Sequence, residues 1–146
     1  MTIDGMAIAL EEARAAEARG EVPIGAAIVR DGALLARAGN RTIGDDDPTA
    51  HAEMLAIRAA AAAGGHRLVA ADLYVTLEPC AMCAGAISFA RIRRLYFGAR
   101  DPKGGAVENG ARFFTQPTCH HAPEVYGGMS ESEASVMLRK FFQARR

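Results

Sequence analysis

Two short motifs constrain the fold of this chain more than any other part of its sequence. One reads Thr-Ala-His-Ala-Glu and supplies His51 and Glu53, and the other reads Glu-Pro-Cys-Ala-Met-Cys and supplies Cys80 and Cys83. Cysteines at positions i and i+3 share one face of a helix. Imidazole and thiolate ligands suit Zn²⁺, and three protein ligands leave the fourth tetrahedral position for water. We therefore expect a fold that brings two helix starts together around one zinc ion.

Glu53 follows His51 by two residues, which turn through about 200° on a regular helix. Their side chains converge only at a point beyond the helix end. We therefore predict that His51 binds the metal from the first turn of a helix beginning at Ala50, and that Glu53 reaches the bound water. Two thiolates offset the charge of Zn²⁺, so this metal acidifies water less than a three-histidine site would. In this hypothesis Glu53 takes the water proton, hydroxide attacks an amidine-like ring carbon, and the proton goes to departing ammonia.

The same residue types have plainer interpretations. Histidine at a helix start is often only a cap, and a Cys-x-x-Cys pair can be redox-active, but Pro79 and the separate His-x-Glu favour a metal. Cys119, His120 and His121 form a second cluster, which we expect in a surface loop outside the zinc shell because neighbouring residues point apart. Glu78 either orients the site from behind the ligands or pairs with a nearby arginine.

Hydrophobic periodicity and turn signals predict helices that alternate with strands. The predicted elements are a helix capped by Asp4 and ended by Gly20, strands 23–29 and 33–38 joined by an Asp-Gly turn, helix 50–63, strand 73–77, helix 81–90, strand 94–98 and a final helix capped by Ser130. Segment 100–128 is predicted as a long loop. Because helices in this order must bury both faces of a sheet, we predict an α/β fold, a three-layer α/β/α sandwich on a mixed sheet.

Length and composition limit the class of protein. A chain of 146 residues suits one domain, 1–146, with one active site. No apolar run reaches the roughly 18 residues that span a bilayer, so we expect no membrane contact. The first ten residues lack a secretory pattern, and three cysteines without an export signal favour a reducing compartment, which makes the cytoplasm the expected location.

The formal net charge is zero, but the charges are unevenly distributed along the chain. Residues 1–90 carry 7 Lys+Arg and 12 Asp+Glu, a net of −5, and residues 91–146 carry 10 and 5, a net of +5. The late basic groups either gather into a phosphate-binding surface or form an ordinary solvated one.

His-x-Glu together with Pro-Cys-x-x-Cys is the signature of the zinc nucleobase deaminases. Segments 21–26, 47–53, 73–86 and 97–105 extend the likeness, and over nearly its whole length the chain resembles the bacterial tRNA adenosine deaminases. The resemblance implies a cytidine-deaminase-like fold. It also implies a homodimer that hydrolyses the wobble adenosine of a tRNA anticodon stem-loop to inosine.

The resemblance further implies four substrate contacts. Asn40 would hydrogen-bond the flipped base, Asp101 and Lys103 would contact the sugar or flanking phosphate, and Phe142 would stack on or wall in a neighbouring base. Taken alone, Asn40 is also typical of a turn, Asp101 and Lys103 of a solvated loop, and Phe142 of a helix core. Segment 107–128 departs from the family pattern, which leaves its anticodon-loop contacts open.

Two rival functions fit parts of the pattern. A deaminase of a free base or nucleoside, of the guanine or cytosine type, would share the fold and metal but need no RNA surface. A non-catalytic zinc-stabilised RNA-binding domain would close the metal with a fourth protein ligand. The basic late segment favours an RNA substrate, whose binding should weaken steeply with salt.

Overall fold

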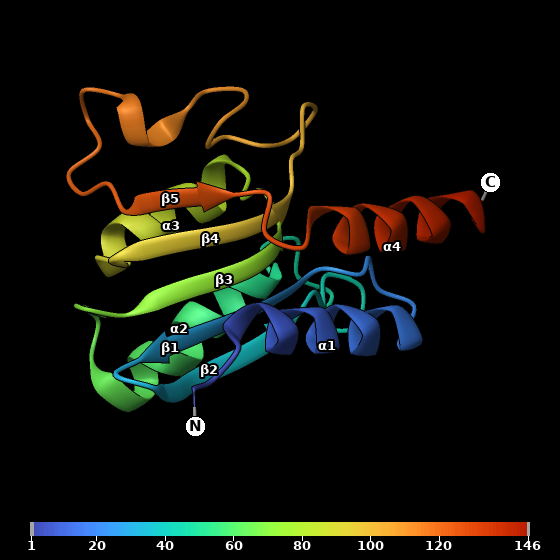
Figure 1. Cartoon of the computed structure of the whole chain (residues 1–146), viewed down its shortest axis with the longest axis horizontal. Coiled ribbons are helices and arrows are strands. Elements are labelled where there is room, and N and C mark those ends of the chain that lie inside the picture. Colours follow the sequence, from blue (N-terminus) through green and yellow to red (C-terminus); the bar gives the residue numbers. More distant parts are fainter. Residues whose placement is uncertain (1, 146) are drawn as a thin grey trace.

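The computed structural model describes residues 2–145, and its centre is a five-stranded sheet in the order β2-β1-β3-β4-β5 (Figure 1). β1 runs antiparallel to β2 and β3, whereas β3, β4 and β5 are parallel to one another. The mixed sheet predicted from the sequence is therefore confirmed. The strands are β1 (Gly25–Arg30), β2 (Ala33–Gly39), β3 (Asp72–Leu77), β4 (Arg94–Ala99) and β5 (Glu124–Gly127).

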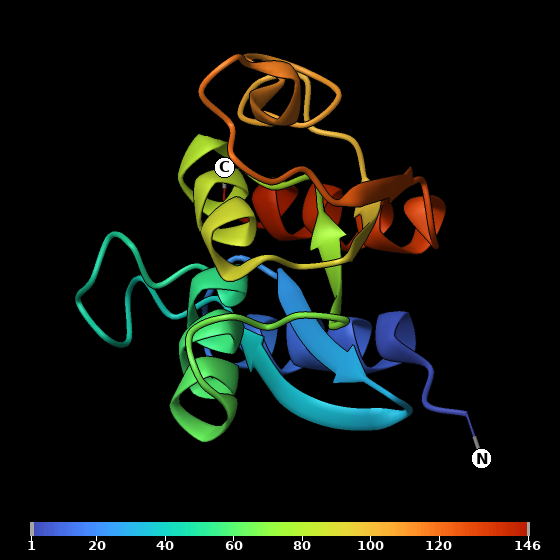
Figure 2. The same cartoon turned by 90° about the vertical axis from the view of Figure 1, so that its left-hand side faces the viewer.

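Four helices cover the sheet on both faces. α1 packs on β1, β2 and β3 and α4 packs on β3 and β4, while α2 packs on β1, β2 and α3. Figure 2 shows α1 and α4 on one side of the sheet and α2 and α3 on the other. The predicted three-layer α/β/α architecture is confirmed. The helices are α1 (Gly5–Ala18), α2 (Ala52–Gly64), α3 (Ala81–Ala90) and α4 (Glu131–Gln143).

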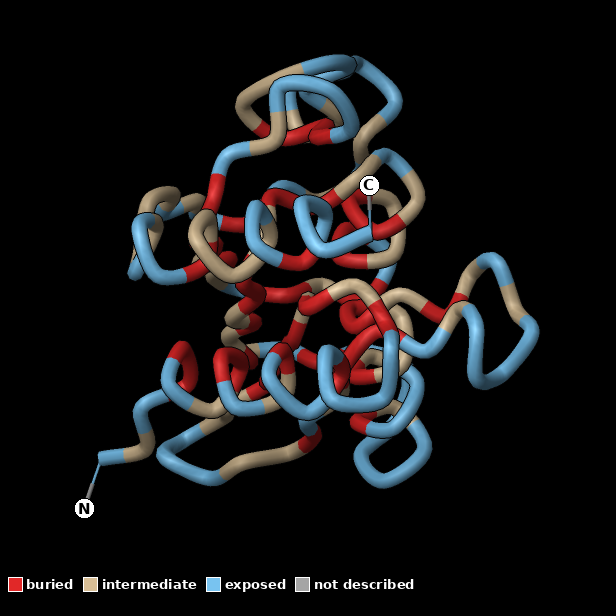
Figure 3. Tube along the Cα trace, turned by 90° about the vertical axis from the view of Figure 1, so that its right-hand side faces the viewer, coloured by how far each residue is buried: buried red, intermediate tan, exposed pale blue. Residues whose placement is uncertain are grey.

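Each face of the sheet has its own hydrophobic core. The larger core lies against α2 and α3 and includes Ile28, Leu95 and Phe97, all fully buried. The smaller core lies against α1 and α4 and includes Met6 and Leu10. Figure 3 shows buried positions where α1 and α4 face the sheet and exposed positions on their outer sides, as amphipathic helices require.

Several local signals act as predicted. The Asp4 carboxylate accepts a hydrogen bond from the Ala7 N–H at 3.0 Å and so caps α1. Asp31 and Gly32 have φ angles of 52° and 76°, the two positive values that a tight type I′ hairpin turn needs. Within residues 2–145, no helix combines the length and apolar character needed to cross a membrane.

Two predictions for the late segment are wrong in part. Segment 100–128 is not all loop, since it contains β5 and a single 3₁₀ turn at Phe113–Thr115. β5 is short and lacks its own alternating pattern, but it pairs with β4, and its Tyr126 ring stacks on Tyr96 with centroids 5.1 Å apart. Ser130 does precede α4, but its φ is 56° and its side chain makes no capping hydrogen bond.

Candidate metal centre

The three predicted metal ligands meet where α2 and α3 begin. His51 and Cys80 are the residues immediately before α2 and α3, both with extended backbone, and Cys83 lies in the first turn of α3. α2 begins at Ala52 rather than Ala50, so His51 precedes the first turn in which we predicted it. Neither His51 nor Cys80 caps its helix with its side chain. Both side chains are therefore free to face the same point.

The distances within this group fit one tetrahedral zinc ion. His51 Nδ1 lies 3.6 Å from Cys80 Sγ and 3.5 Å from Cys83 Sγ, and all three donor atoms lie within 4.8 Å of one another. Tetrahedral bonds of about 2.3 Å to sulfur and about 2.1 Å to nitrogen place such atoms about 3.6 Å apart. In the described part of the chain this is the only such group of His, Cys, Asp or Glu residues, and it contains three members. The group would therefore give a bound ion three protein donors, one fewer than a tetrahedral site takes.

The pKa values of the two thiols are shifted in opposite directions. The pKa of Cys80 is lowered to about 4, first because the Cys83 thiol donates a hydrogen bond to it and then because of His51. The pKa of Cys83 is raised because its thiol donates the hydrogen bond to Cys80 and because Cys83 is buried. A separate hydrogen bond between His51 and Cys80 raises the pKa of His51. A cation bound by both sulfurs would take the place of the proton that Cys83 holds.

Glu53 lies in the first turn of α2 with 4% of its surface exposed. Burial is the main reason that its pKa is raised, and the negative charge of Cys80 adds to the effect. With His51 and Cys80 it lines an inner cavity of about 130 Å³. A buried carboxylate with a raised pKa can accept a proton and release it again, as a proton carrier must.

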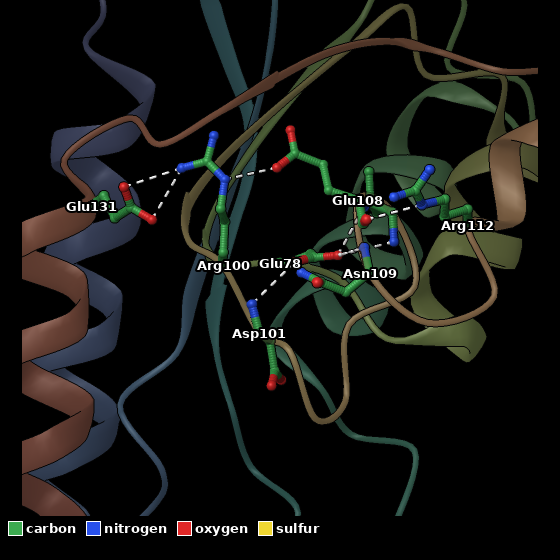
Figure 4. A network of polar contacts seen from close by, with 8 residues as sticks. Glu78, Arg100, Asp101, Glu108, Asn109, Arg112 and Glu131 are labelled. Atoms are coloured by element: carbon green, nitrogen blue, oxygen red, sulfur yellow. Dashed lines mark hydrogen bonds and ion pairs between the residues drawn. The ribbon is translucent and has the colours of Figure 1, made fainter.

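Glu78 lines the same cavity but has a different environment. Burial favours its neutral form, but N–H donors from Asp101, Asn109 and Val107 outweigh burial and lower the pKa of Glu78. The arginine interpretation of Glu78 is wrong, because no ion pair between Glu78 and arginine forms in residues 2–145. The contacts of Glu78 run instead to a distant loop (Figure 4), and the interpretation that it orients the site stays a prediction.

An outer groove of about 590 Å³ continues from the inner cavity. Four residues line both, namely Ile24, Leu77, Asp101 and Gly104. Sequence reasoning missed Ile24 and Leu77 as wall residues. Leu77 ends β3 directly before Glu78, whereas Ile24 precedes β1 and is far along the chain from both motifs. The groove leads on to Lys103 and to Phe142, whose side chain is 50% exposed and so does not belong to the core.

The remaining predicted site residues take different positions. Asp101 Oδ1 accepts hydrogen bonds from the Lys103 and Gly104 N–H groups, so it shapes its own turn while lining both spaces. Asn40 is 5% exposed and donates its N–H to the Ile24 carbonyl at 3.0 Å, but it does not line either space. Within residues 2–145 its side-chain amide makes no hydrogen bond to protein.

The second cysteine and histidine cluster lies elsewhere. The Cys119 thiol contacts Ser88 Oγ at 3.6 Å and the His121 carbonyl at 3.2 Å, and His121 Nε2 contacts the Ile92 carbonyl at 2.7 Å. These contacts tie the loop to α3 and to the connection between α3 and β4. His120 is exposed, and none of the three residues joins the group around His51.

The late basic residues are partly neutralised by carboxylates. Arg93 pairs with Asp72, Arg94 pairs with Glu124, and Arg100 bridges two glutamates. Lys103 forms none of the ion pairs found in residues 2–145. The excess of basic residues in this part of the chain therefore overstates the free positive charge at its surface.

Comparisons with known proteins agree with this geometry. The family model described as the cytidine and deoxycytidylate deaminase zinc-binding region matches residues 2–99. The tRNA-specific adenosine deaminase of Agrobacterium fabrum (strain C58) is 66% identical over 142 residues, which cover 97% of this chain and 93% of the relative.

Solved structures of deaminases are also similar to this chain. A structure from work on A-to-I editing by tRNA:A34 deaminases at the wobble position of transfer RNA matches with a TM-score of 0.89 and 66% identity, covering 91% of this chain and 97% of the other. A guanine deaminase from Nitrosomonas europaea matches with a TM-score of 0.77 and 27% identity, covering 97% and 85%.

Proposed function

Because this chain belongs to the cytidine and deoxycytidylate deaminase zinc-binding family, we propose that it hydrolyses adenosine to inosine at the wobble position of a tRNA anticodon. Its relative at 66% identity is a tRNA-specific adenosine deaminase. The observation that carries the proposal is an inner cavity that is lined by the buried Glu53 and by His51 and Cys80 of the His-Cys-Cys group, and that continues into an outer groove.

The chemistry needs a metal-held water and a proton carrier. His51, Cys80 and Cys83 would hold a zinc ion, which would supply a Lewis acid and a more acidic water. Glu53 accepts a proton from the attacking water and delivers it to the leaving amino nitrogen. A bond from oxygen to C6 of the purine forms, the bond from C6 to the amino nitrogen breaks, and the products are inosine and ammonia.

The substrate residues follow from the two connected spaces. The inner cavity, whose lining includes Ile24 and Leu77, suits one flipped base. The Asn40 amide does not line this cavity, and its proposed hydrogen bond to the base rests on the family resemblance alone. Asp101 and Lys103 are proposed to contact the sugar or flanking phosphate. Phe142 is proposed to stack on a neighbouring base, for which its half-exposed ring is suited.

A free-base deaminase is the nearest competing function, since a guanine deaminase shares the fold. The outer groove supports the RNA substrate instead, because a free base needs only the inner cavity. The non-catalytic alternative needs a fourth ligand, and the described donor group offers three.

The test is incubation of the zinc-loaded protein with tRNA transcripts, followed by sequencing that reads inosine as guanosine. We expect inosine only at the first anticodon position, and a transcript with guanosine there should yield no ammonia. Free guanine, cytosine and adenosine serve as competing substrates. Turnover of a free base at a rate above that of tRNA, and insensitive to salt, would replace the proposal with its competitor.

We also propose that the protein is a homodimer of one domain, 1–146, in the cytoplasm. The outer sides of α2 and α3 form an apolar surface lined by Ile57, Ala61 and Ala86, beside which Phe89 is 71% exposed. Exposed apolar surface of this kind is typical of a protein interface. Sedimentation should give a dimer for the wild type and a monomer for Phe89→Glu. A monomeric wild type at assay concentration would refute the dimer.

A further inference from the structure

Glu78 connects the metal-ligand motif to a distant loop. We call residues 101–109 the pocket loop, because Asp101 and Gly104 line both the inner cavity and the outer groove. Glu78 Oε1 accepts hydrogen bonds from the Asp101 N–H at 3.0 Å and from Asn109 Nδ2 at 2.8 Å. Its Oε2 accepts from three consecutive backbone N–H groups, those of residues 107, 108 and 109, at 3.1, 2.9 and 3.0 Å.

These contacts occupy the whole carboxylate. A carboxylate offers about four lone-pair positions, and Glu78 accepts five hydrogen bonds while 2% exposed. It therefore has no free acceptor for a metal, a water or a substrate. Although it lies two residues before Cys80, its contacts are those of an anchor for backbone and not those of a ligand or a base.

The pocket loop passes so close to Glu78 that position 105 has no room for a side chain. A Cβ atom added at Gly105 would lie 2.5 Å from Glu78 Cδ and 2.6 Å from the Asp101 carbonyl. The Ala106 N–H donates to the Pro79 carbonyl at 2.9 Å, next to Cys80. On the outer side, Arg100 joins Glu108 of the loop to Glu131 of α4 (Figure 4).

We propose that Glu78 is a positioning residue that fixes the pocket loop against the metal-ligand motif and so sets where Asp101 and Lys103 meet the RNA. This inference rests on the proposed function for its substrate. Its physical basis is independent of the substrate, because a buried acceptor that holds five donors decides the path of the loop.

Glu78→Gln tests the inference because it changes one oxygen into a donor. The remaining oxygen can stay with the three backbone N–H groups, and the Asn109 amide can turn to present its own oxygen to the new NH₂ group. The Asp101 N–H then faces another donor. The substitution should therefore release the part of the pocket loop that carries Asp101 and Lys103.

The measurements are steady-state kinetics on tRNA, zinc content and amide hydrogen exchange. Contacts to the sugar and phosphate are the same in the ground state and the transition state, so their loss raises KM more than it lowers kcat. We expect Glu78→Gln to raise KM about tenfold with zinc content and kcat close to wild type, and to speed exchange at Asp101. Asn109→Ala, which removes one donor and keeps the buried charge, should raise KM about fivefold.

Glu124→Gln is the matched control, because it removes the same charge from an exposed ion pair on β5 and should leave KM within about twofold of wild type. The inference would be overturned if Glu78→Gln and Asn109→Ala both kept the wild-type KM but bound less zinc or had a smaller active fraction. Glu78 would then have only a structural role. If the wild type makes no inosine in tRNA, the proposed function fails. Unchanged protection of the pocket loop in Glu78→Gln would then still refute the positioning role.

Discussion

Replacing Glu53 by glutamine should stop turnover while the metal and the fold remain. Glutamine has nearly the same shape as glutamate, so it fits a site that is 4% exposed without opening a cavity. It cannot accept a proton from water or return one to the leaving nitrogen. Because Glu53 is not among the three metal donors, zinc content should stay at one per chain.

The expected size of the effect follows from the two proton transfers assigned to this one carboxylate. General acid–base catalysis contributes about 10²- to 10⁴-fold to a rate. Loss of both transfers should lower kcat at least about 10³-fold, or about 4 kcal/mol of activation free energy, with little change in KM. The assay is single-turnover inosine formation in tRNA, with Glu17→Gln on the exposed side of α1 as the control.

The pH dependence of thermal stability provides a second test of Glu53→Gln. Burial raises the pKa of Glu53 in the folded, metal-free chain above its value in the unfolded chain. The contribution of Glu53 to the free energy of unfolding is therefore fully present below the unfolded-state pKa, and it is lost as pH rises through the folded-state pKa. Chelator-treated wild type should therefore lose more thermal stability between acidic and neutral pH than Glu53→Gln. Retention of more than about a tenth of wild-type kcat by fully zinc-loaded Glu53→Gln would refute the assigned role.

Three further predictions concern the metal, the groove and the core. Cys83→Ala should bind much less than one zinc per chain by elemental analysis, and a thermal midpoint still lowered by chelator would contradict its role as a ligand. Phe142→Ala should raise KM for tRNA about tenfold with little loss of stability. Phe141→Ala, at a position that is 5% exposed, should instead lower the free energy of unfolding in urea by about 3 kcal/mol. Gly25→Ala should destabilise by about 1–3 kcal/mol, because its new Cβ would lie 2.5 Å from the Ala13 nitrogen of α1, while Gly85→Ala meets open space and should not.

The residues of the metal centre were predictable because their signals are local. A histidine or a cysteine next to a helix start places its donor atom by the geometry of a few neighbouring residues, as His51 and Cys80 do. The Asp-Gly hairpin and the Asp4 cap are equally local, and each was found from adjacent residues alone. The layer order followed from alternating helices and strands, because both faces of such a sheet must be covered.

Other features depend on partners far apart in the chain. β5 has too little pattern of its own, and it becomes a strand because β4 offers it a parallel edge. Phe142 has helical spacing that is typical of a core, but the position of α4 leaves its ring half exposed beside the groove.

The metal-binding group and the layers of the fold were thus readable from the sequence, because the donors stand in two recognisable motifs and alternating helices and strands must cover both faces of a sheet. The role of Glu53 as the proton carrier stays a prediction. Tertiary structure alone decided that Glu78 holds a loop and that the inner cavity opens toward Phe142. The Val107 N–H lies 29 residues from Glu78, and no local preference specifies which of many buried donors a carboxylate meets. That choice is made only when packing brings the pocket loop across the motif, because a buried carboxylate must be satisfied by the donors the fold places around it.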